Sequence, residues 1–260
     1  MIRAITLDFG NTLVPVPNGA LREVVGETAR AIATRLGPFE VDEVDRVWAE
    51  ERARQFREEV PHGREVDLAQ RLSRILARLR GMPAPPEAEP WDDAAAALLS
   101  DAAERDWAVD VYSREFVARL PPTPAAGALL AALAPRYRLA ILSNWPLATT
   151  IDRYVEAAGW SSFLHAVVVS QRVGTIKPHP AIFAAARDAL GQPAPGEILH
   201  VGDDWAADVV GAKRAGWLAA YLRDRPADSP LPGSDRDTSV AADIELDVLG
   251  DLEAALERLG

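Results

Sequence analysis

The segment LDFGNTLV, residues 7–14, ends the first apolar run of the chain in an acid, Asp8, which is followed after Phe9 by a Gly-Asn turn. Residues 2–7 are short, apolar and rich in branched side chains, which predicts a buried strand. An acid at the tip of a strand most often serves a turn or a helix cap. Asp8 is therefore a candidate nucleophile only if other polar groups gather at the same edge of a sheet.

Short apolar runs and helical patterns alternate over most of the chain. The runs expected to form strands are residues 2–7, 139–142, 166–169, 198–201 and 217–222, and those expected to form helices between them are residues 125–133, 148–158, 180–190 and 206–215. Within the strands the apolar residues are continuous, which is typical of a parallel sheet covered on both faces. The sequence therefore predicts an α/β fold, whose ligands bind beyond the carboxyl ends of the strands.

A different kind of segment lies between the first two strands. Residues 15–120 contain no convincing strand, and several amphipathic helices are expected there, one of them with the apolar stripe Leu68, Leu72, Ile75, Leu76 and Leu79, closed by Gly81. Prolines bracket the segment. We expect a discontinuous core, residues 1–14 and 121–260, and an all-helical insertion, residues 15–120, over the strand tips. Residues 83–97 and 224–240 are expected to be loops, the latter on the surface.

Composition limits the classes of function. The chain has 260 residues and a formal net charge of -11, which argues against a nucleic acid or an anionic membrane as partner. It has no cysteine, which excludes disulfides and thiolate chemistry, and its only two lysines are Lys177 and Lys213. Residues 1–7 do not resemble a signal peptide, so none is expected, and no apolar run reaches the roughly 20 residues that span a membrane. We expect a cytoplasmic protein, and the sequence does not indicate an oligomeric state.

Polar residues follow three of the predicted strands. The first strand ends in Asp8, the second runs into Ser143-Asn144, and the fourth runs into Gly202-Asp203-Asp204 with Asp208 beyond, while Lys177 precedes a helix. Asp8 could attack a phosphorus atom. Asp8, Asp203 and a backbone carbonyl offer the hard oxygen ligands that Mg²⁺ prefers. Ser143, Asn144 and Lys177 could bind the phosphoryl group of a small phosphorylated substrate, and Asp208 is better placed to orient the other groups.

Each of these residues alone has an ordinary structural explanation as a turn, a cap or a solvated side chain. Their occurrence together, in order and at strand tips, favours a site. The four histidines, His62, His165, His179 and His200, show no metal-ligand spacing and are expected to be structural.

Four segments resemble the haloacid dehalogenase (HAD) superfamily, in the subgroup with a helical cap inserted after the first core strand. They are LDFGNTLV, LSNW, GTIKPHPAIF and HVGDDWAADVVGAKRAG, and they span the whole core. The resemblance implies a hydrolase with a Rossmann-like core and a mobile cap that excludes water and selects the substrate. It also implies Asp8 as nucleophile, Thr12 as the usual threonine of the first motif, Ser143 and Lys177 at the phosphoryl group, and Mg²⁺ bound by Asp203 with Asp208 in support.

The chain departs from the phosphatases of this superfamily at residue 10. They usually carry a second acid there, which protonates the leaving group, whereas Gly10 can offer only its carbonyl as a metal ligand. Asn11 fills the usual glycine position, where it tolerates a left-handed conformation. Loss of a general acid typically costs about 10²- to 10⁴-fold in rate, and this loss falls hardest on alkyl phosphates.

Three interpretations stay open. The first is a Mg²⁺-dependent phosphatase that is slow, is restricted to good leaving groups, or uses another acid such as Asp204 or a residue of the cap. The second is a metal-independent hydrolase of the haloacid dehalogenase type; those enzymes lack the second acid, but they also lack the Gly-Asp-Asp metal motif seen here. A phosphonatase would need a lysine in the cap, and residues 15–120 contain none. The third is a non-catalytic relative that binds phosphate or a partner, although a decayed site should have lost more groups.

Overall fold

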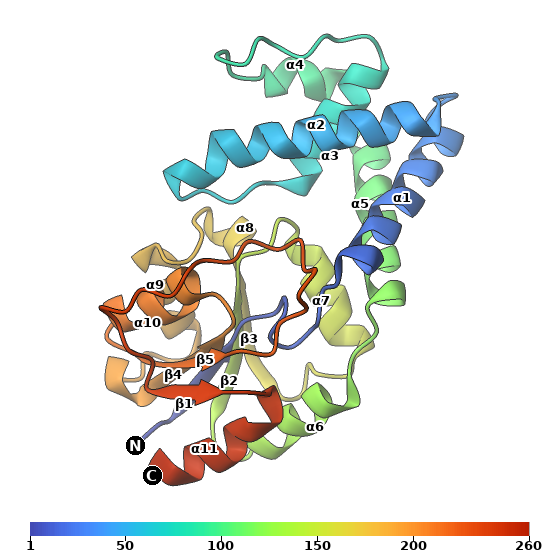
Figure 1. The fold of residues 1–260 in the computed structure, drawn as a ribbon. Helices are drawn as coiled ribbons and strands as arrows, with labels where there is room; N and C mark the ends of the chain where they lie inside the picture. The colour runs from blue at the N-terminus through green and yellow to red at the C-terminus, as the bar shows by residue number, and fades with distance from the viewer. Residues whose placement is uncertain (260) are drawn as a thin grey trace.

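The computed structural model describes residues 1–259, in which six parallel strands form one sheet (Figure 1). The strands are β1 (Ala4–Leu7), β2 (Arg138–Ser143), β3 (Leu164–Val169), β4 (Ile198–Gly202), β5 (Leu218–Leu222) and β6 (Ile244–Leu246). Their order is β3-β2-β1-β4-β5-β6, so the chain reverses its direction of winding next to β1. The predicted α/β fold with a parallel sheet is confirmed, and β1 lies at the crevice where such sheets bind ligands.

The register of the three central strands aligns their carboxyl ends. Leu7 pairs with Ile141 of β2 and with Val201 of β4. The Asp8 amide then donates a hydrogen bond to the Val201 carbonyl at 2.8 Å. The residues that follow β1, β2 and β4 therefore emerge side by side at one edge of the sheet.

Helices cover both faces of the sheet. They are α6 (Pro124–Leu133), α7 (Ala148–Ala157), α8 (Ser170–Val173), α9 (Pro180–Ala189), α10 (Gly211–Arg214) and α11 (Leu252–Leu259). Ile5 and Leu7 belong to one hydrophobic cluster with residues of α6, α7 and α11, whereas Ala4 belongs to another with residues of α9 and α10. Burial on both faces explains why the strand sequences are continuously apolar.

Before α6 and β2, the segment that follows β1 contains five α-helices and no strand. They are α1 (Asn18–Arg35), α2 (Val41–Glu59), α3 (Leu68–Leu79), α4 (Asp93–Leu98) and α5 (Ala102–Arg119). In Figure 1, α1 and α5 run side by side away from the sheet, and α2 and α3 lie across the top. Of the predicted stripe on α3, Leu79 is partly buried and the other four residues are buried. Asp67 caps this helix by accepting a hydrogen bond from the Gln70 amide at 3.0 Å. The division into core 1–14 and 121–260 and cap 15–120 stays a proposal, which this arrangement supports.

Several elements differ from expectation. Residues 83–97 were expected to be a loop, but α4 begins at Asp93, where Asp92 caps a run of alanines. Strand β6 was not predicted because it has only three residues and follows a long loop. The helix expected over 206–215 begins as a π-helix, Trp205–Val210, and becomes α-helical only at Gly211. No single helix among residues 1–259 is long and apolar enough to cross a membrane; α5 and α6 reach that length and composition only when taken together across a 94° bend.

Candidate active site

Lys177 connects two acids at the carboxyl edge of the sheet. Its side chain is buried, and Nζ lies 2.9 Å from Asp8 Oδ1 and 2.6 Å from Asp208 Oδ1, while it also donates to the Leu142 carbonyl at 2.9 Å. Burial alone would lower the pKa of Lys177, but the carboxylates of Asp208 and Asp8 raise it well above its ordinary value. The ammonium group therefore stays charged. Burial raises the pKa of Asp8 above its ordinary value even though the charge of Lys177 lowers it.

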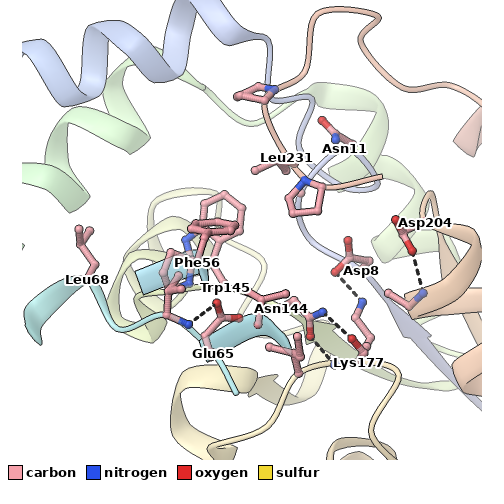
Figure 2. A pocket seen from close by; sticks show the side chains of 18 of the residues that line it. Asp8, Asn11, Phe56, Glu65, Leu68, Asn144, Trp145, Lys177, Asp204 and Leu231 are labelled. Atoms are coloured by element: carbon pink, nitrogen blue, oxygen red, sulfur yellow. Dashed lines mark hydrogen bonds and ion pairs between the residues drawn. The ribbon is translucent and has the colours of Figure 1, made fainter. Parts of the chain in front are cut away.

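Asn144 holds the backbone of Lys177 in place. Its side-chain oxygen accepts a hydrogen bond from the Lys177 amide at 2.7 Å, and its nitrogen donates to the Lys177 carbonyl at 3.1 Å (Figure 2). Both polar atoms of this side chain are thus bonded to one residue. Asn144 follows β2 and Lys177 precedes α9, so this pair fixes the lysine at the tip of the neighbouring strand β1.

Both oxygens of Asp208 are engaged by the protein. Oδ1 meets Lys177 and, at 2.9 Å, His200 Nε2, while Oδ2 accepts a hydrogen bond from the Asp204 amide at 2.9 Å. Burial alone would raise the pKa of Asp208, but Lys177 and His200 hold it well below its ordinary value. His200 is in turn bonded through Nδ1 to Thr6 Oγ1 at 2.8 Å. This saturation supports an orienting role for Asp208.

His200 was expected to be structural, and its contact with the site was missed. It lies in the middle of β4 and is buried. The available signal was a titratable residue within an otherwise apolar strand that leads into the Gly-Asp-Asp motif. Such a residue needs a buried hydrogen-bond partner, and Asp208 supplies it.

Asp203 follows β4 and faces the same point. Thr12 Oγ1 donates to its Oδ1 at 3.3 Å, and Arg225 Nη1 lies 3.1 Å from its Oδ2. Burial raises the pKa of Asp203 to about 8, and the negative charges of Asp8 and Asp208 add to this effect. The carboxylate is therefore held in a position where a further positive charge would stabilise its ionised form.

The acids offer a donor set suited to a hard divalent cation. One oxygen from each of Asp8, Asp203 and Asp208 lies within 4.8 Å of the others. The Gly10 carbonyl accepts none of the backbone hydrogen bonds of the 9–14 turn, which leaves it free as a further ligand. Carboxylate and carbonyl oxygens are the ligands that Mg²⁺ takes in proteins, so the residues present fit this ion, with Asp8, Asp203 and Gly10 as the ligands and Asp208 in support.

A loop expected to lie on the surface closes over the turn at residues 10–11. Residues 224–240 form no helix or strand, as predicted, but Leu231 approaches Gly10 so closely that a Cβ there would lie 2.6 Å from Leu231 Cδ1 and 3.0 Å from Trp145 Cζ3. Ser229 bonds the Asn11 side chain, and Asn11 has the left-handed φ of 58° that its position predicts. Leu231 of the loop thus lies next to the position of the usual second acid, beside Asn11 (Figure 2).

The Ser143 hydroxyl lies close to the Asp8 carboxyl. The residue is 1% exposed, and its hydroxyl helps to lower the pKa of Asp8 but forms no hydrogen bond of regular geometry among residues 1–259. Buried hydroxyls are normally bonded. Its position at the end of β2, next to Asn144, leaves it free to donate to a bound substrate.

A cavity of about 420 Å³ connects this site with the helices above it. Its floor includes Asp8, Lys177 and Asp203, and its walls are mostly apolar. Glu65 lines the same cavity, where it bonds Ser170 Oγ and accepts a hydrogen bond from the Val66 amide at 3.0 Å. Burial raises the pKa of Glu65 to about 7. No sequence pattern singled out this acid, because it lies in an irregular segment before α3.

A family model for haloacid dehalogenase-like hydrolases matches residues 2–216, which is most of the chain. The chain belongs to this family. Pyrimidine 5'-nucleotidase YjjG of Escherichia coli (strain K12) is 33% identical over 109 residues, covering 40% of this chain and 48% of that protein. (S)-2-haloacid dehalogenase of Xanthobacter autotrophicus is 38% identical over 104 residues, covering 40% of each chain. The matches therefore span less than half of either relative.

Solved structures of this family share the whole fold. The 2-haloacid dehalogenase from Pseudomonas syringae pv. Tomato DC3000 superposes with a TM-score of 0.67 at 20% identity, covering 100% of both chains. At this identity the likeness establishes the fold alone. The membership predicted from the four motifs is confirmed, and the choice between phosphate and halide chemistry rests on the residues of the site.

Proposed function

We propose that this haloacid dehalogenase-like hydrolase is a Mg²⁺-dependent phosphatase that acts on a small phosphorylated metabolite through an aspartyl-phosphate on Asp8. The observation that carries the proposal is the cluster of Asp8, Asp203 and Asp208, whose oxygens lie within 4.8 Å of one another. Three carboxylates at this spacing repel one another, and a divalent cation between them would remove that repulsion. A Mg²⁺ ion held there would also neutralise charge on the transferring phosphoryl group.

The protein groups have separate tasks in the reaction. A carboxylate oxygen of Asp8 attacks phosphorus, the bond from phosphorus to the leaving oxygen breaks, and that oxygen departs with the electron pair. The Lys177 ammonium group and the free Ser143 hydroxyl stabilise the phosphoryl oxygens. Water then attacks the phosphorus of the aspartyl-phosphate, which releases inorganic phosphate and restores Asp8.

Gly10 restricts the leaving group. Gly10 has no proton to give, and Leu231 and Trp145 lie where the side chain of the usual second acid would begin. The phenolate of an aryl phosphate and the carboxylate of an acyl phosphate can leave without being protonated, whereas the alkoxide of an alkyl phosphate needs a proton. The proposed enzyme therefore favours substrates with good leaving groups.

A metal-independent dehalogenase is the second candidate. Arg225 favours it, because its guanidinium lies 3.1 Å from Asp203 Oδ2 and supplies positive charge where the cation would be held. In this alternative Asp8 attacks a carbon atom and halide departs. The absence of a side chain at residue 10 fits both candidates, whereas the Asp203–Asp208 pair is explained only by the first.

The test is phosphate release from an aryl, an acyl and an alkyl phosphate, each with Mg²⁺ and with EDTA, beside chloride release from 2-chloropropanoate. We expect metal-dependent turnover that favours the aryl and acyl esters. Asp8→Asn should reduce it to the background rate, and Asp235→Asn, an exposed acid of the 224–240 loop, should not. Chloride release that EDTA leaves unchanged, with no phosphate release, would establish the second candidate instead.

A further inference from the structure

Arg71 is a buried cation whose hydrogen-bonding capacity is only partly used by the protein. It lies on α3, its side chain is 4% exposed, and its Nε donates to Gln55 Oε1 at 2.9 Å. Its Nη2 is buried and has no hydrogen-bond partner among residues 1–259. By contrast, Arg74 and Arg78 on the same helix each bond two acids, whereas Arg71 forms no ion pair within the described chain.

Arg52 and Tyr112 line the same cavity as Arg71. The Arg52 guanidinium lies 4.8 Å from the centre of the Phe56 ring and forms no ion pair within residues 1–259. Burial lowers the pKa of Arg71 to about 10, and the nearby charge of Arg52 contributes to this. Arg71 is thus a buried guanidinium with no acid paired to it and with the exposed Arg52 nearby, and an anion bound between the two would offset the cost of burying its charge.

Glu65 does not pair with Arg71. It is the cavity acid whose charge acts on Arg71, but its two oxygens are bonded to Ser170 and to the Val66 amide. Asp67, the other acid near Arg71, is bonded to the Gln70 amide and to Gln171. Neither acid therefore bonds Arg71, and its Nη2 stays without a protein acceptor among residues 1–259 although the residue lines the cavity.

The walls between this pair and the strand tips are apolar. They include Trp48, Phe56, Leu68 and Trp145. In Figure 2, Phe56, Trp145 and Leu68 extend away from Asp8 and Lys177 along the cavity. A ligand that spans it would carry its phosphoryl group at Asp8, an apolar body against these side chains, and an anion at the far end.

We propose that Arg71 and Arg52 form a second anion subsite, which binds a carboxylate on the leaving group of the substrate. The substrate class is then a phosphate ester of an aromatic or similarly apolar carboxylic acid. An aryl ester also satisfies the need for a good leaving group. The assignment of the phosphoryl end rests on the proposed function, whereas the carboxylate subsite can be tested without it.

The binding test uses 3-phenylpropanoate, its homologues with one methylene fewer and one more, and the matching amides, each titrated into the full chain by calorimetry. At least one acid should bind about tenfold or more tightly than its amide, because charge-assisted bonds to a guanidinium are strong. Arg71→Gln and Arg52→Gln should remove that preference, and Arg71→Lys should keep part of it. Arg57→Gln is the matched control, since Arg57 is exposed on α2 and pairs with Glu87. Equal binding of acids and amides, or a preference that survives both glutamine variants, would overturn the subsite.

Kinetics separate this proposal from the proposed function. With phenyl phosphates that carry a carboxylate or a carboxamide, we expect a lower KM for the acid and a similar kcat. Phosphate release with the same KM for both would overturn the subsite and leave the phosphatase intact. Selective binding of the acids without phosphate release from any ester would overturn the phosphatase and leave the subsite intact. Should Arg71→Gln fail to fold, the same measurements on Arg52→Gln test the subsite, because Arg52 is exposed and its replacement is expected to leave the fold intact.

Discussion

The two ends of the cavity differ in how their charges are satisfied. At the core end Lys177 bridges Asp8 and Asp208, and Arg225 meets Asp203, so each charged group has a partner within the protein. At the cap end Arg71 has a buried nitrogen with no partner among residues 1–259. The core end is therefore organised before a substrate arrives, and the cap end becomes satisfied only when one is bound.

This difference indicates how the two ends divide the work. A preorganised set of charges stabilises a reaction regardless of the rest of the substrate. Hydrogen-bond donors that have no partner and lie among apolar side chains discriminate between substrates, because they favour a ligand that supplies the missing acceptor. Loss of the charged groups at the core end should slow the reaction of all substrates, whereas changes at the cap end should affect KM for some substrates more than for others.

The largest expected effect is the loss of Lys177. Lys177→Met leaves Asp8 and Asp208 buried without their cation, which should cost about 3–5 kcal/mol in the free energy of unfolding. The control is Lys213→Met, which removes the only other lysine and its partly exposed pair with Asp243, and should cost about 1 kcal/mol or less. Urea unfolding measures both. Similar losses for the two variants would show that the core end is not held together by its charges.

The pH dependence of stability tests whether Glu65, the acid at the cap end of the cavity, is buried as the structure shows. Since burial raises the pKa of Glu65 from 4.5 to about 7, the folded protein keeps a proton between these values that the unfolded chain releases. The contribution of Glu65 to stability should therefore fall as the pH rises through this window, by about 3 kcal/mol at most. Asp203, whose pKa burial raises to about 8, should cause a decrease of its own over this range. Glu65→Gln should therefore make the total decrease smaller without abolishing it, and Glu257→Gln, an exposed control on α11, should leave it unchanged. Urea unfolding at about pH 5 and about pH 8 gives the comparison, and parallel profiles for the wild type and Glu65→Gln would contradict it.

Introducing an acid at residue 10 tests whether Leu231 of the 224–240 loop occupies the space that the usual second acid needs. Gly10→Asp alone should gain little, because its Cβ would lie 2.6 Å from Leu231 Cδ1. Combined with Leu231→Ala it should accelerate hydrolysis of alkyl phosphates by about 10²-fold and of aryl phosphates by less. Leu231→Ala alone is the control. Equal acceleration of both ester classes would mean that the new acid does not protonate the leaving group.

The smallest effect is expected at Arg225. Its guanidinium competes with a cation for Asp203, so Arg225→Gln should tighten Mg²⁺ binding a few-fold, equivalent to about 1 kcal/mol. Arg236→Gln, which removes an exposed arginine of the same loop, is the control. Calorimetric titration with Mg²⁺ measures the difference. Unchanged or weaker binding in Arg225→Gln would show that the two cations do not compete.

The sheet and its strand tips were predictable because their signals are local. Continuous apolar runs indicated five of the six strands; Asp8 and Asp203 stand directly after two of them, and Ser143 is the last residue of a third. Parallel pairing then brings these tips together without any further information. Their roles in catalysis and metal binding stay predictions.

The contributions of long loops and of the cap were not predictable. Leu231 and Arg225 reach the site from a loop with no periodic pattern, and nothing local to them indicates a contact with residues 10 or 203. Arg71 is one of many arginines on helical segments, and only the fold distinguishes it from its ion-paired neighbours. His200 shows the intermediate case, in which an unusual residue was visible but its partner was not.

The most direct test of the central claim is to trap the covalent intermediate. The enzyme is mixed with an aryl phosphate and Mg²⁺, quenched in acid, digested with trypsin and analysed by mass spectrometry. The peptide that covers residues 4–22 contains Asp8 as its only acidic side chain. We expect this peptide to gain one phosphoryl group in the presence of Mg²⁺, and neither with EDTA nor in Asp8→Asn. Phosphate release in the absence of a phosphorylated 4–22 peptide, or phosphorylation at another residue, would contradict the account.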